Sequence, residues 1–290
     1  MCAKFSAEMR EIMINLIKAD FYRIFRGMGI YIGFAVMILM IVLDIYTVSA
    51  GSLVFKVSTE ATIENELNGM SYEDVSQLSI DDYRKYMLGT ENYQLDRDVL
   101  AQNINLYYIF IFVGAVIITA DFSGGSVKNT LSSAISRRKY FLSKLVCVVI
   151  CCLMLFFLNT YIMYFANLIF NNKSLALGIG EITRITLLQL PPILALSSIL
   201  IGFAFILKRP AAFNTATITL MLVVQMLMSL LSFFLKIPEK VFDFELSNML
   251  ARLAYYPSTD YVVKSYLVCS VMIAGALLLG WSFFKKAEIK

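Results

Sequence analysis

Few residues of this chain have the type and spacing that catalysis needs. The sequence contains no histidine, so the commonest general base and metal ligand is absent and an H-E-x-x-H zinc motif cannot occur. It has no G-x-S-x-G nucleophile motif, and GGSVKNT at 124–130 lacks the spacing of a phosphate-binding loop. Cys147 and Cys151 could share a helix face, but within an apolar run we expect them to act as small buried hydrophobes. We therefore expect no enzyme site and no bound cofactor or metal on this chain.

The most distinctive polar stretch is segment 121–144, DFSGGSVKNTLSSAISRRKYFLSK, which holds five basic residues and one acid between two apolar runs. Short loops rich in Lys and Arg stay on the cytoplasmic side of a membrane. After a break at Gly124 and Gly125, apolar residues recur with helical spacing, at Val127, Leu131, Ala134 and Ile135. This pattern predicts a short amphipathic helix at the inner membrane surface, where it could contact a cytoplasmic partner.

The composition is that of an integral membrane protein. Of 290 residues, 59% are apolar, and the mean hydropathy is +0.73, whereas soluble domains are closer to 45–50% apolar. The five cysteines lie at the N-terminus or inside apolar runs, so no disulfide framework is expected. Acids at Glu8, Glu11 and Asp20 make the N-terminal region unlike a signal peptide.

Hydropathy divides the chain into six predicted transmembrane helices of an all-α protein, each near the length of about 20 residues that crosses a bilayer. The predicted spans are 28–50, 101–120, 145–170, 182–207, 213–235 and 262–284. Pro191 and Pro192 interrupt the fourth, and Trp281 lies at the inner end of the sixth, where aromatic residues anchor the membrane interface. The remaining parts are an interfacial elbow helix at 1–27, an extracellular lobe at 51–100, the cytoplasmic segment 121–144 and an extracellular or re-entrant segment at 236–261. Basic residues dominate the inner segments and acids the outer ones, which predicts that both termini are cytoplasmic.

Two of the predicted segments outside the membrane have a helical pattern. The elbow helix at 1–27 is amphipathic and too charged to span, so it is expected at the inner interface, although it could instead be a solvated helix packed on its own protein. The lobe at 51–100 is too long for a bare connection, and its Ser-x-x-Asp spacings predict short helices. We expect its acids to form a solvated surface rather than a metal site.

Polar residues inside the apolar runs are the candidates for a transport path. Asp44 is the only acid within a predicted span, near its outer end, and Asn105 and Gln225 lie in predicted spans 2 and 5. An intramembrane acid usually faces a partner or a wet cavity. The alternatives are that Asp44 reaches the outer interface and that the two amides form local hydrogen bonds between helices.

Residues 125–144, GSVKNTLSSAISRRKYFLSK, resemble the segment that follows the second span in type-2 ATP-binding-cassette permeases. In that family a Gly-Ser/Thr-hydrophobic-Lys element, a Leu-Ser pair and a Ser-Arg-Arg element lead into the third span. The resemblance implies a six-span permease driven by a separate cytoplasmic ATPase, which would bind ATP and Mg. It implies that the ATPase-coupling residues are Asp121, Lys128, Asn129, Leu131, Arg137 and Arg138. Asp121 stands where the family often has Glu, and the alternative is that the segment is only a topology signal.

The same resemblance implies a pairing with a second copy of the chain or with a similar permease. Spans 1, 2 and 5 would line the route at the dimer axis, with Asp44, Asn105 and Gln225 as its polar points. The apolar interior and the acidic lobe favour export of amphipathic or cationic peptides, of antimicrobial or toxin type, across a bacterial plasma membrane. The alternatives are small lipophilic drugs as cargo, or a channel or sensor that transports nothing. Membrane lipid, but no nucleic acid, is expected as a further contact.

Overall fold

A computed structural model describes residues 2–49, 97, 100–132, 135–170, 177–235, 243–255 and 257–287 of the chain. All secondary structure in these residues is helical, which confirms the predicted all-α class for the described part. The predicted lobe at 51–100 lies outside the described residues, except for Arg97 and Leu100.

The N-terminal half begins with two helices joined at Gly27, α1 (Cys2–Arg26) and α2 (Met28–Ser49). The ends of these helices that flank the junction, Ile14–Arg26 and Ile30–Ile45, are bent by 64° from each other. The predicted second span is one continuous run of helical turns, made of the 3-10 helix η1 (Gln102–Asn105), α7 (Leu106–Gly114), the π-helix η2 (Ala115–Thr119) and α8 (Ala120–Ser123). Segment 121–144 then forms the short α9 (Ser126–Ser132) and the beginning of α10 (Arg137–Phe170).

In the C-terminal half the predicted fourth span is divided into α11 (Ile179–Leu188) and α12 (Leu190–Leu207). The two helices meet at Gln189, and Pro191 and Pro192 lie in the first turn of α12, where a missing N–H is tolerated. The predicted proline interruption is therefore confirmed as a helix break. A tight turn at Lys208, in the left-handed conformation, leads to α13 (Pro210–Leu235), and α14 (Leu246–Ala254) and α15 (Thr259–Lys286) follow.

Four helical runs in the described residues are long and apolar enough to cross a membrane, and α1 with α2 adds a fifth if the bent pair is one span. The four are Gln102–Ser123, Arg137–Ala166, Leu190–Leu207 and Thr259–Lys286. They correspond to the predicted spans 2, 3, 4 and 6. The predicted fifth span is helical as α13 but is not among these runs, so the membrane character of the chain is confirmed and the count of six is not.

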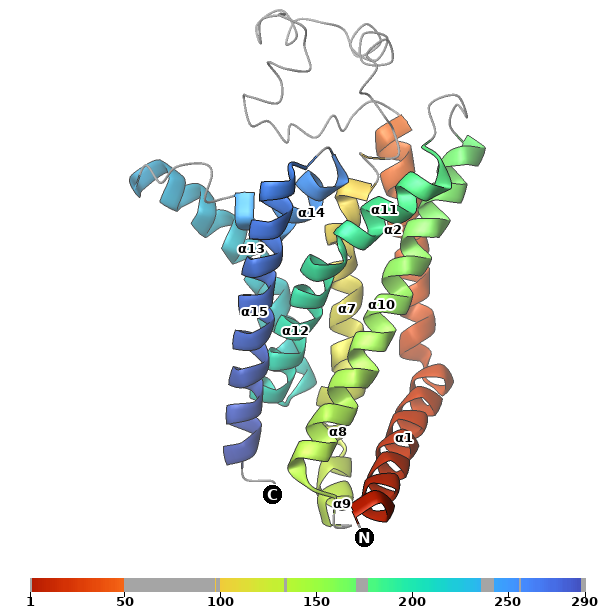
Figure 1. Cartoon of the computed structure of the whole chain (residues 1–290), viewed down its shortest axis with the longest axis vertical. Coiled ribbons are helices and arrows are strands. Elements are labelled where there is room, and N and C mark those ends of the chain that lie inside the picture. Colours follow the sequence, from red (N-terminus) through yellow and green to blue (C-terminus); the bar gives the residue numbers. More distant parts are fainter. Residues whose placement is uncertain are drawn as a thin grey trace, which may run out of the picture.

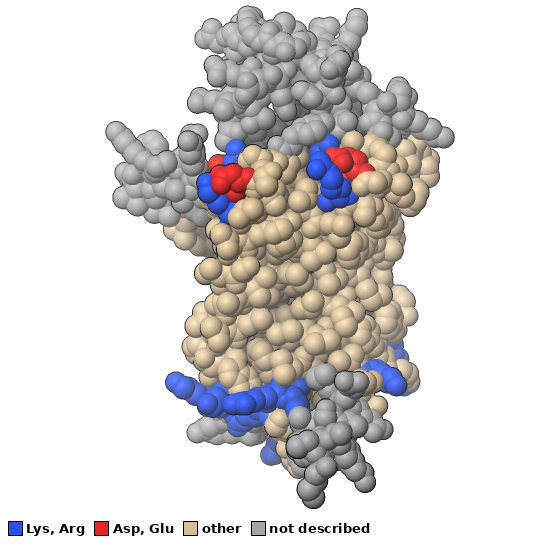
Figure 2. Space-filling model, in the orientation of Figure 1, with Lys and Arg blue, Asp and Glu red and all other residues tan. Residues whose placement is uncertain are grey.

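The long helices run roughly side by side, with α1, α9 and the C-terminal end of α15 at one end of the bundle and α11 and α14 at the other (Figure 1). Figure 2 shows a broad uncharged belt between these two ends. On the face shown, Lys and Arg occupy the end that carries α9, while both acids and bases occur at the opposite end. We call these the inner and outer ends, following the predicted topology.

The closest helix pair in the described residues is α12 with α15. A Cβ atom added at Gly202 would lie 2.8 Å from the Ala276 carbonyl oxygen, and one added at Gly280 would lie 2.9 Å from the Gly202 Cα. Only glycine allows two backbones to approach this closely, as small residues do in membrane helix pairs. The two helices therefore form a tightly fitted pair at one side of the bundle.

Candidate functional site

The predicted coupling segment lies at the inner end of the bundle, and its glycine break is confirmed. α8 ends at Ser123, and Gly125 adopts a left-handed conformation with φ of 69° before α9 begins. Val127 is buried and Leu131 packs against the core, while Lys128 and Asn129 are exposed. The short α9 is thus amphipathic, as predicted, but its apolar side contacts the protein itself. The described helix reaches Ser132, Ala134 lies outside the described residues, and Ile135 is not helical, so the predicted stripe is seen only at Val127 and Leu131.

Asp121 is one corner of a closed ring of four charged side chains, which we call the ion-pair ring: Asp20, Arg23, Asp121 and Lys144. Acids and bases alternate in this ring. Arg23 bonds to Asp121 and lies 3.2 Å from Asp20 Oδ1. Lys144 Nζ lies 2.6 Å from Asp20 Oδ1 and 2.5 Å from Asp121 Oδ2. Each charge therefore has two partners of opposite sign, and the ring is neutral as a whole.

Three corners of the ion-pair ring are buried, and the ring joins three parts of the chain that are distant in sequence. Asp20, Asp121 and Lys144 are 6%, 4% and 3% exposed, whereas the Arg23 side chain is 39% exposed. Asp20 and Arg23 come from α1, whereas Asp121 and Lys144 stand at the two ends of segment 121–144. Tyr140 also donates a hydrogen bond of 2.8 Å to Asp121. The ring therefore closes the base of segment 121–144 and fixes α1 to it.

Arg137, one of the predicted coupling residues, contacts the end of α15. Its guanidinium donates hydrogen bonds to the carbonyl oxygens of Phe284, Lys285 and Ala287, at 3.2, 2.7 and 2.9 Å. These carbonyls belong to the last turn of α15 and to the residue after it, where helix carbonyls have no partner within the helix. Arg137 thus caps α15, and its neighbour Arg138 is exposed.

An aromatic cluster surrounds this attachment of the coupling segment to α15. Phe141 packs against Phe205, Trp281 and Phe284, with ring centroids 4.6, 5.4 and 6.3 Å away. Trp281 was predicted to anchor the membrane interface, and the structure places its ring against this cluster. The inner ends of α10, α12 and α15 are therefore held together by contacts between aromatic rings as well as by Arg137.

Asp44 and Asn105, two of the predicted path residues, lie together near the outer end. The Asn105 amide donates to both Asp44 oxygens, at 3.3 and 3.4 Å, and Asp44 is 9% exposed. This contact is the hydrogen bond between helices that was the alternative interpretation of Asn105, and it gives Asp44 a polar partner. The side chain of Gln225 lies outside the described residues, and a translocation path through the three residues stays a prediction.

A buried network of side-chain amides, which the sequence did not indicate as a unit, holds the outer ends of several helices together. Asn103 donates to Gln189 at 2.7 Å, and Asn159 donates to Asn103 at 3.2 Å. Gln189 in turn donates to the carbonyl oxygens of Leu100 and Leu250, at 3.1 and 2.8 Å. The amides therefore connect α10, η1, α14 and the break between α11 and α12.

A second outer attachment involves Arg97, whose side chain is 2% exposed. It donates to the Ala254 carbonyl at 2.7 Å, at the end of α14, and forms an ion pair of 2.9 Å with Glu181 at the beginning of α11. Arg184 also bonds to Glu181, and the two guanidinium groups hold the pKa of this carboxyl below its usual range.

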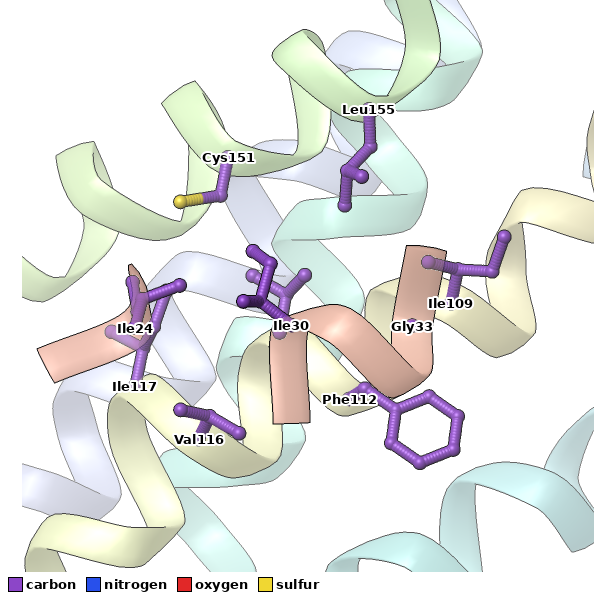
Figure 3. A pocket seen from close by; sticks show the side chains of 10 residues that line it. Ile24, Ile30, Gly33, Ile109, Phe112, Val116, Ile117, Cys151 and Leu155 are labelled. Atoms are coloured by element: carbon purple, nitrogen blue, oxygen red, sulfur yellow. The ribbon is translucent and has the colours of Figure 1, made fainter. Parts of the chain in front are cut away.

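An apolar cavity of about 30 Å³ lies beside the bend between α1 and α2. Its walls come from α1, α2, α7, η2 and α10, and Figure 3 shows side chains from these elements around a common space. Ile24 and Ile30 approach it from the two sides of Gly27, and Ile117 approaches from the π-helix. The cavity offers no polar lining for a charged or hydrogen-bonding ligand.

The described residues contain no group of three or more Cys, Asp or Glu side chains that could hold a metal ion. Comparison of the chain with protein-family models and with curated proteins finds no match. An assignment of this chain to a family or an activity therefore has to be argued from its own residues.

The sequence did not indicate the partners of Asp121 in the ion-pair ring, which are Arg23 and Lys144. The available signal was the charge pattern of α1, in which an acid and a base three residues apart lie on one face of an otherwise amphipathic helix. Polar residues on the apolar side of a helix ordinarily indicate a buried partner elsewhere in the chain.

Proposed function

We propose that this chain is the membrane permease subunit of a type-2 ATP-binding-cassette exporter, and that a separate ATPase binds to segment 121–144. The observation that carries the proposal is how this segment is held. The ion-pair ring closes its base and Arg137 attaches it to α15, while Lys128, Asn129 and Arg138 are exposed. A firmly held segment with an exposed basic face is what a partner needs in order to move a membrane bundle.

The charge of the inner end supports the same function. The side chains at this end are described from Ile14 on; among them the exposed charged ones are basic, and the acids Asp20 and Asp121 are buried in the ion-pair ring. A basic surface attracts an acidic surface of a partner protein. The chain itself has no phosphate-binding loop, so the energy for transport would come from that partner.

The test is recovery of an ATPase with the tagged permease. Lys128→Glu with Arg138→Glu should reduce the amount of ATPase recovered and should abolish transport, because both exposed charges would then repel the acidic partner surface. The matched control is Lys264→Glu, an exposed lysine at the outer end of α15. Equal recovery of the ATPase from the double variant and the unmodified chain would rule out this docking surface. Arg137 is not used, because its substitution would uncap α15.

We propose amphipathic or cationic peptides as the cargo, exported by a dimer of this chain or by its pairing with a similar one. The Asp44–Asn105 pair supports this choice, since a buried carboxylate in an apolar span can attract a cationic group. Stimulation of ATP hydrolysis in the reconstituted complex should be larger with amphipathic cationic peptides than with lipophilic dyes. Stimulation by dyes alone would instead indicate drug export, and no stimulation by either would favour a channel or sensor.

A further inference from the structure

Helices that are joined by the ion-pair ring carry a large desolvation penalty. The free energy of removing charges from water can exceed the attraction between them, and apolar residues of the same size often stabilise a protein as well or better. Buried ionic groups are best explained where they fix one arrangement against another. In this chain they fix α1 to both ends of segment 121–144.

The ring leaves some of its hydrogen-bonding capacity unused. Among the described residues, no donor reaches Asp20 Oδ2 and no acceptor reaches Arg23 Nε, although both atoms are buried. Arg23 also makes long contacts, of 3.4 and 3.3 Å, to the carbonyl oxygens of Val116 and Ile117 in the π-helix. A fully satisfied polar network would stabilise this region more, so stability alone does not explain the ring.

The structure next to the ring is easy to deform. The 64° bend lies at Gly27, η2 is a π-helix, and the apolar cavity separates Ile24, Ile30 and Ile117. π-helical turns are common at functional sites, and a cavity gives side chains room to move. The α12–α15 pair is the opposite case, because its two backbones are already in contact at Gly202 and Gly280.

We propose that the ion-pair ring is a latch that makes α1 and segment 121–144 one mechanical unit, which turns about Gly27 and displaces α2. Asp20, Arg23 and Lys144 are then positioning residues of the coupling surface, acting through Asp121. Because α2 carries Asp44, a turn of this unit would change the environment of the Asp44–Asn105 pair. The statement that an ATPase drives this displacement rests on the proposed function. The statement that α1 and segment 121–144 move as one unit does not.

The test measures the distance between α1 and α9 in the purified chain, in lipid nanodiscs and without any ATPase. Spin labels are placed at the exposed positions Lys18→Cys and Asn129→Cys, in a chain whose five native cysteines are replaced by alanine. The variant Asp20→Asn with Lys144→Met removes one acid and one base, so no unpaired charge is buried. We expect the unmodified ring to give one narrow distance distribution and this variant to lose it.

Two further variants make the result specific. Asp260→Asn with Lys264→Met removes an exposed pair of the same type from α15 and should leave the distribution narrow. Tyr140→Phe removes one hydrogen bond to Asp121 without changing the shape of the side chain, and should broaden the distribution to a lesser degree. If the variant Asp20→Asn with Lys144→Met does not fold, Tyr140→Phe still tests whether the ring holds α1 near α9.

An unchanged narrow distribution in the folded ring variants would overturn the latch. Broadening in the ring variants and in the α15 control alike would also overturn it, since the effect would then be general loosening. A latch confirmed by these distances in a chain that recruits no ATPase would leave the inference standing and remove the proposed function instead.

Discussion

Gln189 fills the break between α11 and α12 with three hydrogen bonds, and each of its partners is buried. Gln189→Leu would keep the volume but leave the Leu100 and Leu250 carbonyls and the Asn103 amide without this partner. A buried polar group left unsatisfied costs about 1–3 kcal/mol. We therefore expect thermal unfolding in detergent to shift down by several degrees. Gln102→Leu is the control, because Gln102 is only half-buried and makes a long contact of 3.5 Å; an equal shift in both would contradict the assignment.

Glu181 should make the outer end sensitive to acid. Its pKa is lowered in the folded chain by Arg184 and Arg97, so its contribution to stability is complete above the pKa of an unfolded glutamate. That contribution is lost as the pH falls through the lower pKa of the folded state. Because the carboxyl is 30% exposed, we expect about 1 kcal/mol or less. Unfolding temperatures of the unmodified chain and Glu181→Gln should differ at neutral pH and converge in acid; a difference that persists below that pKa would contradict the pairing.

Residue types were easier to predict from the sequence than their partners. Asp44 and Asn105 were both selected as polar residues within apolar runs, and their contact bridges 61 positions that no local pattern spans. The contact between Lys144 and Asp20 likewise joins residues that are 124 positions apart. For Arg137 contact with a partner protein stays a prediction, and its hydrogen bonds to α15 depend on where that helix ends in space. Local periodicity gives the face of a helix, whereas pairing depends on the tertiary arrangement.

The glycine contact between α12 and α15 gives a prediction for these two elements. Gly280→Ala would place a methyl group 2.9 Å from the Gly202 backbone, which cannot yield as a side chain would. We expect a loss of about 1–3 kcal/mol, the usual cost of overpacking, measured as a lower unfolding temperature. Gly275→Ala on the same helix is the control, because no atom lies within 4 Å of the added Cβ. That variant should be neutral or more stable by up to about 1 kcal/mol, from the higher helix propensity of alanine. Equal effects of the two changes would contradict the close approach.

At the scale of the elements, the sequence predicted most helix positions because apolar length and glycine or proline breaks are local signals. The Gly124–Gly125 break and the interruption near Pro191 are examples. The π-helix at Ala115–Thr119 left no such signal, since its residues are ordinary for an apolar span. The division of span 4 was expected at the prolines, and it occurs at Gln189, where a side chain satisfies the freed backbone groups.

For the whole molecule, the separation of charge between the two ends predicts which end faces the cytoplasm. Lys128 lies at the inner end and Asp260 at the outer end, and both are exposed. In a chain with Cys2 replaced by serine, a membrane-impermeant maleimide applied to intact cells should label Asp260→Cys. Lys128→Cys should react only after the cells are opened, because loops rich in Lys and Arg stay inside. Labelling of Lys128→Cys in intact cells would reverse the topology and remove the cytoplasmic docking surface.

The ion-pair ring also has a consequence for how the chain is made. Asp20 and Arg23 leave the ribosome long before their partners in the ring, Asp121 and Lys144, and Lys144 follows Asp20 by 124 positions. Until then these two side chains have only each other and water as partners, because burying incompletely paired charges is too costly. During synthesis α1 therefore has to wait at the aqueous surface of the membrane while the following spans insert. Although α1 precedes the other described helices in the chain, it would be among the last to reach its final position, and truncation before Lys144 would leave it at the surface.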